Sequence, residues 1–152
     1  MNVLITGAAS RLGRAIAAEL ATDHRLRLFD SIPVDPGEKA EFIQGDLTDP
    51  KTVWQAVRGV DAILHTGEPP PELPEGSLER EQCLLDHATR GTHVLFSAGV
   101  EAGVRRFVYG STLEIFTAYP DDIYITETWK PLPSPEMLSM SRYLGELTCR
   151  EF

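Results

Sequence analysis

The sequence lacks a disulfide framework, a surplus of positive charge and any long hydrophobic run. Its two cysteines, Cys83 and Cys149, form no C-x-x-C pair, which argues against a zinc site and suits a reducing compartment. We therefore expect a cytoplasmic protein without a bound metal. The formal net charge of −9 argues against binding to DNA or RNA, because nucleic-acid affinity depends on a basic surface. No apolar run has the length of a membrane span, so we expect no membrane partner.

Short apolar runs alternate with amphipathic stretches along the whole chain. This alternation is typical of βαβ units and a parallel sheet. The runs predict strands at 3–5, 26–29, 41–43, 61–64 and 106–109. The stretches predict helices at 12–20, 50–57, 78–102 and 137–152. We expect one α/β domain over 1–152, a Rossmann-type doubly wound parallel sheet with helices on both faces.

A glycine-rich loop follows the first predicted strand and opens the first helix. Gly7 permits a tight turn, and Gly13 lets the helix pack closely on the strand. Backbone N–H groups at a helix start, here those of Ser10, Arg11 and Leu12, favour a bound phosphate. Ser10 stands where the usual pattern has its middle glycine, and its hydroxyl can donate to a phosphate oxygen. The loop predicts a dinucleotide site.

Asp30 ends the second predicted strand, where the same pattern expects an acidic residue. A carboxylate there accepts hydrogen bonds from ribose hydroxyls and repels a 2′-phosphate, so it favours NAD over NADP. Arg11 and Arg14 weaken that preference, because they can neutralise phosphate charge. The alternative is that Asp30 only caps a turn and the loop binds nothing.

Four segments resemble the extended short-chain dehydrogenase/reductase superfamily, which includes NAD-dependent sugar epimerases, dehydratases and uronate dehydrogenases. They are 6–13, 45–49, 61–65 and 103–112, in the family's order. The resemblance implies NAD as cofactor and a small, sugar-like substrate.

The resemblance also implies further cofactor contacts. It places Asp46 and Leu47 near the adenine, and the backbone of His65, Thr66 and Gly67 beside the ribose and phosphates. Without the resemblance, Asp46 is a turn residue and His65 a strand-end residue. The shared order of motifs favours cofactor contact for Asp46, and both interpretations stay open for His65.

The catalytic residues of the superfamily are only partly present. The resemblance makes Thr112 the hydroxyl that hydrogen-bonds the reacting carbonyl or alcohol, although a cap is an equally open interpretation. The superfamily uses a Tyr-x-x-x-Lys pair, in which lysine lowers the tyrosine's pKa and holds the nicotinamide ribose. Ser141 and the segment 145–146 match that motif's context, which aligns Leu138 with the tyrosine and Arg142 with the lysine. Leucine has no proton to give, whereas arginine keeps the charge and can still bind the ribose.

No other tyrosine replaces the missing phenol by position. Tyr143 lies roughly 140° around the helix from Leu138, at ~100° per residue. Tyr119 and Tyr124 belong to a proline-rich loop, where we expect local packing. Ala88 also stands where the superfamily usually has an asparagine.

The resemblance implies later strands and a substrate region that these 152 residues do not contain. Leu144, Leu147 and Phe152 still follow a helical pattern with no closing glycine or proline, which is consistent with the N-terminal part of a longer chain. The superfamily's dimers imply a homodimer through the long helix and the C-terminal helix.

Three hypotheses remain open on the sequence. The first is an NAD-dependent oxidoreductase, epimerase or dehydratase with an unconventional base. The second is a non-catalytic NAD-binding sensor or interaction module, which Leu138 and Arg142 favour. The third is a structural relic without cofactor, supported only by Ser10 and Ala88.

Overall fold

The computed structural model describes residues 1–152 and contains a five-stranded sheet in the order β3-β2-β1-β4-β5. Every neighbouring pair of strands is parallel. The strands are β1 (Asn2–Thr6), β2 (Arg25–Asp30), β3 (Ala40–Gln44), β4 (Ala62–His65) and β5 (Arg106–Tyr109). The predicted parallel Rossmann-type sheet is confirmed. Its strand order reverses between β1 and β4, the place where such sheets bind ligands.

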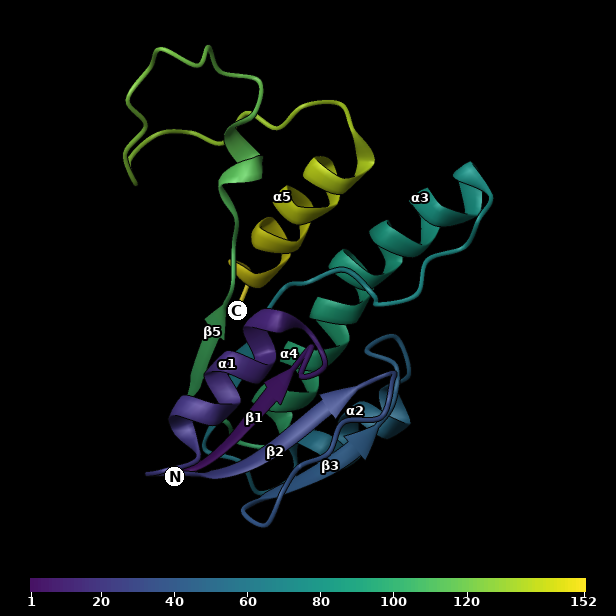
Figure 1. Ribbon diagram of the computed structural model, residues 1–152, viewed down its shortest axis with the longest axis vertical. Helices are drawn as coiled ribbons and strands as arrows, with labels where there is room; N and C mark the ends of the chain where they lie inside the picture. Colours follow the sequence, from purple (N-terminus) through teal and green to yellow (C-terminus); the bar gives the residue numbers. More distant parts are fainter.

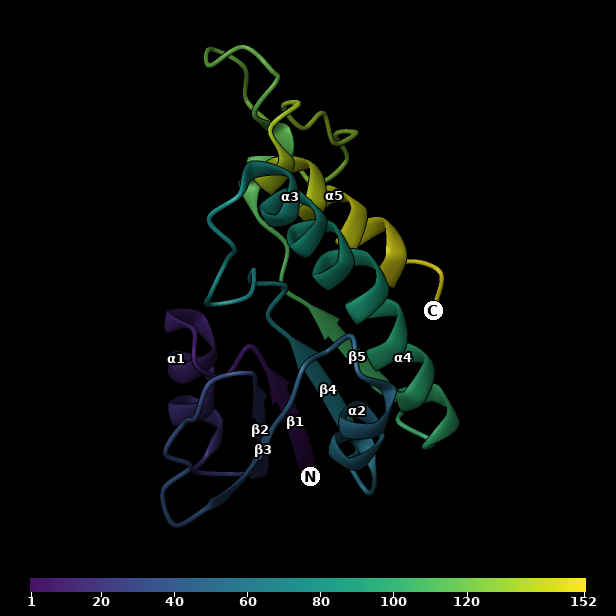
Figure 2. The ribbon, with the colours of Figure 1, turned by 90° about the vertical axis from the view of Figure 1, so that its right-hand side faces the viewer.

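Helices cover both faces of this sheet, as predicted. They are α1 (Arg11–Leu20), α2 (Pro50–Val57), α3 (Ser77–Asp86), α4 (Thr92–Glu101) and α5 (Met137–Cys149), with the short turns η1 (His87–Gly91) and η2 (Leu113–Phe116). Figure 2 shows α1 on one face and α2 and α4 on the other. None of these helices has the length and apolar character needed to span a bilayer.

The core has two parts, one on each face of the sheet. Because successive strand residues point to opposite faces, Leu4 packs on the α2–α4 side with Val53 and Phe96, whereas Val3 and Ile5 pack on the α1 side. The central strands are hydrophobic on both faces because helices cover both. Burial therefore anchors β1, and with it the loop that follows it.

The long predicted helix 78–102 is the main difference from expectation. It is a run of α3 and α4 interrupted by η1, a π-helical turn that packs against α5. Such a turn carries one extra residue and re-aims the side chains beside it. Gly91 closes the turn, and a Cβ there would lie 3.0 Å from the Cβ of Leu47.

Two smaller differences concern the end of the chain. The final helix ends at Cys149 instead of continuing to Phe152, and the short turn η2 precedes the proline-rich segment. In Figure 1 the arrows of β1, β2, β3 and β5 run upward, and α5 stands above the sheet. The loops after β1, β2 and β4 therefore meet at one edge of the sheet, opposite the N-terminus.

Candidate functional site

The glycine loop is a turn in which backbone approaches backbone. Gly7 has φ +69°, and a Cβ on it would lie 2.2 Å from Thr66 Oγ1. A Cβ on Gly13 would lie 2.2 Å from the carbonyl oxygen of Gly7 and 2.9 Å from the Cα of Ala8. The tight turn at Gly7 is as predicted. Gly13, however, makes room for the loop itself and not for the strand.

Ser10 caps the first helix and leaves donors free beside it. Its Oγ accepts the N–H of Gly13 at 2.9 Å, so its own hydroxyl proton stays available. The N–H groups of Arg11 and Leu12 have no backbone partner. Together with the helix dipole, these groups form a site for an anion.

Asp30 joins the glycine loop to the end of β2. Its side chain is buried, and its Oδ2 accepts the N–H of Ala9 at 2.8 Å. Its Oδ1 accepts the N–H of Ile32 at 3.3 Å. Oδ1 also accepts the hydroxyl of Ser31, at 3.5 Å. The carboxylate thus anchors a turn, as the alternative interpretation had it, and both bonds to Oδ1 are long.

A hollow of about 160 Å³ lies between the glycine loop, the ends of β2 and β3, and the loop after β4. Residues predicted as cofactor contacts meet in its wall: Gly7, Ser10, Asp30, Asp46 and Leu47. These residues are distant in sequence, so their meeting comes from the parallel order of the strands. The hollow is wide enough for part of a nucleotide and open at the sheet's carboxyl edge.

Asp46 and Leu47 have different environments although they are adjacent. Asp46 Oδ1 accepts both the N–H and the hydroxyl of Thr48, at 2.7 and 2.9 Å, and the side chain is otherwise exposed. Leu47 is buried in the core. The turn interpretation of Asp46 describes one of its oxygens, and the other remains free to meet a ligand.

His65 belongs to the core and not to the surface of the hollow. Its ring bonds Thr6 Oγ1 at 2.7 Å and Thr92 Oγ1 at 3.1 Å. Burial, with smaller contributions from His87 and Arg142, lowers its pKa to about 3. The imidazole is therefore neutral and structural, joining β1, β4 and α4.

The two residues after His65 pack against neighbouring loops and do not line the hollow. Thr66 is buried beside Gly7, and its Oγ1 accepts the N–H of Glu68 at 3.4 Å. Gly67 has φ +65°, and a Cβ on it would lie 2.5 Å from the carbonyl oxygen of Gly110. Thr66 thus holds the loop after β4 close to the glycine loop, and Gly67 brings the same loop close to the residues at the end of β5.

The α5 end of the site contains Leu138 and Arg142, which the resemblance aligns with the tyrosine and the lysine. Leu138 is half-exposed in the first turn of α5. Arg142 donates to the carbonyl of Gly67 and, at 2.8 Å, to the carboxylate of Glu68. Its Nε is buried without a partner. No local sequence pattern marks Glu68 as a partner of Arg142, because the two lie 74 residues apart.

Hydroxyl groups near this end are mostly engaged locally. Tyr119 Oη donates to the carbonyl of Lys130 at 3.0 Å, and Tyr124 is almost fully exposed. Burial raises the pKa of Tyr109 to about 12, which makes its phenol a poor proton donor. Thr112 caps η2 by accepting the N–H of Glu114, as the alternative interpretation had it, and its hydroxyl proton stays available.

His87 also lines the hollow, and no sequence pattern indicated it. It opens the π-turn η1, opposite the glycine loop. Burial lowers its pKa, and Asp46 and Asp30 oppose that shift. A helical pattern could not have found this residue, because the π-turn changes the face on which it lies.

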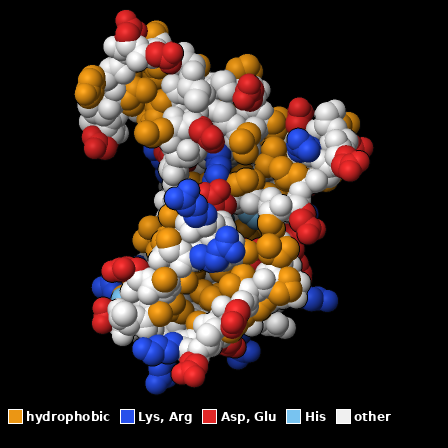
Figure 3. Space-filling model, viewed as in Figure 1, with side chains coloured by type: hydrophobic (Ala, Val, Ile, Leu, Met, Phe, Trp, Pro, Cys, Tyr) orange, Lys and Arg blue, Asp and Glu red, His pale blue; other side chains and the backbone are white.

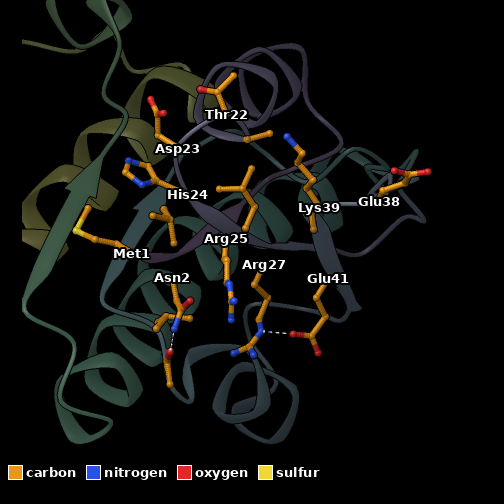
Figure 4. Close-up of a pocket in the computed structure, with 16 residues that line it drawn as sticks. Met1, Asn2, Thr22, Asp23, His24, Arg25, Arg27, Glu38, Lys39 and Glu41 are labelled. Atoms are coloured by element: carbon orange, nitrogen blue, oxygen red, sulfur yellow. Dashed lines mark hydrogen bonds and ion pairs between the residues drawn. The ribbon is translucent and has the colours of Figure 1, made fainter.

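Two other hollows contain none of the predicted residues. The larger, of about 950 Å³, lies at the amino ends of the strands, and Figure 4 shows its mixed charges. There Arg27 pairs with Glu41 at 2.9 Å and donates to the carbonyls of Ala56 and Arg58, so its donors are used internally. An apolar groove of about 530 Å³ lies between α1 and the loop 31–39, where Figure 3 shows hydrophobic side chains.

Residues 3–152 match the model of the NAD dependent epimerase/dehydratase family. The chain belongs to this family. It is 31% identical to the NAD-dependent glucose-6-phosphate dehydrogenase of Haloferax volcanii, over 99% of this chain and 62% of that protein.

Two solved structures are similar in the same way. One is a short-chain dehydrogenase/reductase superfamily protein from Agrobacterium tumefaciens with bound NAD, at 32% identity and a TM-score of 0.84, covering 99% of this chain and 44% of that one. The other is uronate dehydrogenase from the same organism, at 30% identity and a TM-score of 0.81, covering 99% and 55%. The chain therefore spans about half the length of these relatives.

Proposed function

We propose that this chain binds NAD at the carboxyl edge of its sheet. The observation that carries the proposal is the hollow in which the glycine loop, Asp30 and Asp46 meet. The pyrophosphate belongs at the free N–H groups of Arg11 and Leu12, which begin α1. The adenosine ribose belongs at Asp30 Oδ1. Bound NAD in a similar structure from Agrobacterium tumefaciens supports the proposal.

The residues present fit such a dinucleotide. A Cβ at Gly7 or Gly13 would collide with its neighbours, so this loop needs glycine at both positions to bring its backbone close to a ligand. The carboxylate of Asp30 would repel a 2′-phosphate, which favours NAD over NADP. Arg11 and Arg14 are exposed and soften that preference.

The α5 end determines what reaction is available. Bound NAD would supply a hydride acceptor. Arg142 would hold the nicotinamide ribose with its unpartnered Nε, and the hydroxyl of Thr112 would orient a substrate oxygen. Leu138 can neither take nor give a proton. The relatives named above as glucose-6-phosphate and uronate dehydrogenases support a sugar-like substrate for the whole protein.

A second candidate is a non-catalytic NAD-binding module. The Arg142–Glu68 contact favours it, because the cation that aligns with the lysine is already paired with a carboxylate. The two candidates differ in whether any proton exchange with a substrate is possible.

Calorimetric titration with NAD and NADP tests the binding proposal. We expect NAD to bind more tightly than NADP, and absence of heat with both would refute the proposal. Formation of NADH from a panel of uronates and sugar phosphates would then eliminate the non-catalytic candidate. The unmodified chain is compared in the same assay with the double variant Leu138→Tyr, Arg142→Lys. If only the double variant forms NADH, the lack of a Tyr and Lys pair explains the inactivity of the unmodified chain.

A homodimer through the long helix and α5 belongs to the same proposal. Leu95 and Phe96 of α4 are buried in this chain's own core. Val100 and Leu147, on α4 and α5, remain exposed and are available to a second copy. Size-exclusion chromatography with light scattering measures the mass of the protein in solution. A monomer at all concentrations would contradict the proposed homodimer.

A further inference from the structure

His87 occupies a position between two adjoining hollows. The inner one contains Asp30 and the glycine loop. The outer one, of about 300 Å³, is bounded by residues of α3 and of the loops after β3 and β4, among them Gln82 and Asp86. Asp46 and His87 are the two residues common to both. The π-turn places the imidazole at this junction, and π-turns are frequent at functional sites.

The imidazole of His87 is held by burial and not by hydrogen bonds. No hydrogen bond contributes to its environment, although the carboxylates of Asp46 and Asp30 lie near it. Burial lowers its pKa, which favours the neutral form of the ring. A neutral, unbonded aromatic ring in a hollow is available for stacking on a flat ligand.

Hydrogen-bond acceptors surround the ring on the outer side. Asp46 and Asp86 contribute carboxylates and Gln82 an amide. A flat ligand that stacks here therefore meets acceptors along its edge, which suits a base with an amino group. Adenine has such a group, whereas hypoxanthine has a carbonyl oxygen at the same place and would be repelled.

We propose that the adenine of the bound dinucleotide stacks on His87, with its amino group toward Asp46 and Asp86. His87 then selects the cofactor by its base. The inference rests on the proposed function and names the residue that recognises one end of the ligand.

The first experiment measures the affinities of NAD, AMP and nicotinamide mononucleotide by calorimetry. Removing the ring on which a base stacks weakens binding about tenfold. We therefore expect His87→Ala to bind NAD and AMP about tenfold more weakly, and nicotinamide mononucleotide with unchanged affinity. His87→Phe keeps a ring and should retain most of the affinity. His93→Ala, at an exposed histidine of α4, is the matched control and should leave all three affinities unchanged.

Because His87 is partly buried, unfolding without ligand is measured for each variant. His87→Gln supplies a second variant of similar size. If the unmodified chain binds neither NAD nor AMP, the proposed function fails. If it binds both and the folded Ala and Gln variants bind them equally well, only the role of His87 is overturned.

The second experiment compares NAD with nicotinamide hypoxanthine dinucleotide on the unmodified chain. We expect the hypoxanthine form to bind about tenfold more weakly, because a carbonyl faces the carboxylates. Asp86→Asn should reduce this difference, whereas Glu81→Gln, an exposed residue of α3 outside the hollow, should preserve it. Equal affinity for the two dinucleotides would overturn the orientation proposed for the base.

Discussion

The glycine-loop end of the site and its α5 end are built from different parts of the chain. The first consists of backbone: free N–H groups at the start of α1 and close contacts that require Gly7 and Gly13. The second depends on side chains, and there Leu138 and Arg142 stand in a regular helix. Replacing a side chain on a helix surface changes chemistry without changing the fold. The comparison therefore separates the proposed binding of the phosphates and adenosine, at the first end, from the proposed handling of the nicotinamide and substrate, at the second.

Closing the backbone cradle should have the largest effect. In Gly13→Ala the new Cβ would meet the carbonyl oxygen of Gly7 at 2.2 Å, and that backbone has no free rotamer to move away. We expect the free energy of unfolding to fall by about 1–3 kcal/mol and NAD affinity by roughly a hundredfold or more. Chemical denaturation and calorimetry measure the two effects. Gly37→Ala is the control for NAD affinity: the Cβ it adds has no atom within 4 Å, and its φ of +63° should cost stability without touching the site. An equal loss of NAD affinity at both positions would contradict the cradle.

Removing the carboxylate at the same end should have the next effect. Asp30→Ala deletes the acceptor of the Ala9 N–H and the group proposed to bind the ribose. A hydrogen bond to a charged group contributes about 1.5–3 kcal/mol, so NAD affinity should fall at least about tenfold. NADP should lose less, because the repulsion of its phosphate disappears as well. Asp35→Ala, in an exposed turn, should change neither affinity; an unchanged NAD-to-NADP ratio in Asp30→Ala would count against ribose binding.

The two ends also differ in how far the sequence could predict them. The loop, its strand and Asp30 follow local patterns in the sequence. The Arg142–Glu68 contact joins residues 74 positions apart, which no spacing reveals. The π-turn arises where α5 and Leu47 pack on the long helix, so it depends on tertiary contacts. Its consequence, His87 in the hollow, could not be predicted for the same reason.

His65 joins β1, β4 and α4 in the core, and it should make the free energy of unfolding sensitive to acid. Its pKa falls from 6.5 to about 3 on folding, so the unfolded chain binds the proton more tightly. Stability is then complete above pH 6.5 and falls as the pH drops toward 3, by about 1.4 kcal/mol per pH unit. The shift at His87 has the same sign.

Denaturation between pH 7 and 4.5 measures this slope. His65→Gln should flatten it by most of that amount, whereas His93→Ala at an exposed histidine should leave it unchanged. A slope that is the same in all three proteins would show that His65 does not titrate as its burial requires.

The smallest effect is expected at the α5 end. Glu68→Gln removes the charge that pairs with Arg142, whose side chain is 12% exposed against 35% for Glu68. A partly exposed pair is screened by solvent, and Arg142 keeps its contact with the carbonyl of Gly67, so unfolding should become easier by less than about 1 kcal/mol. NAD affinity should change less than about threefold, because the cradle supplies the binding.

Glu41→Gln, which breaks the Arg27 pair at the opposite edge, is the matched control for stability. A tenfold loss of NAD affinity in Glu68→Gln alone would mean that side chains at the α5 end share in the cradle. The two ends of the site would then not act separately, because the pairing of Arg142 would affect binding at the glycine loop as well.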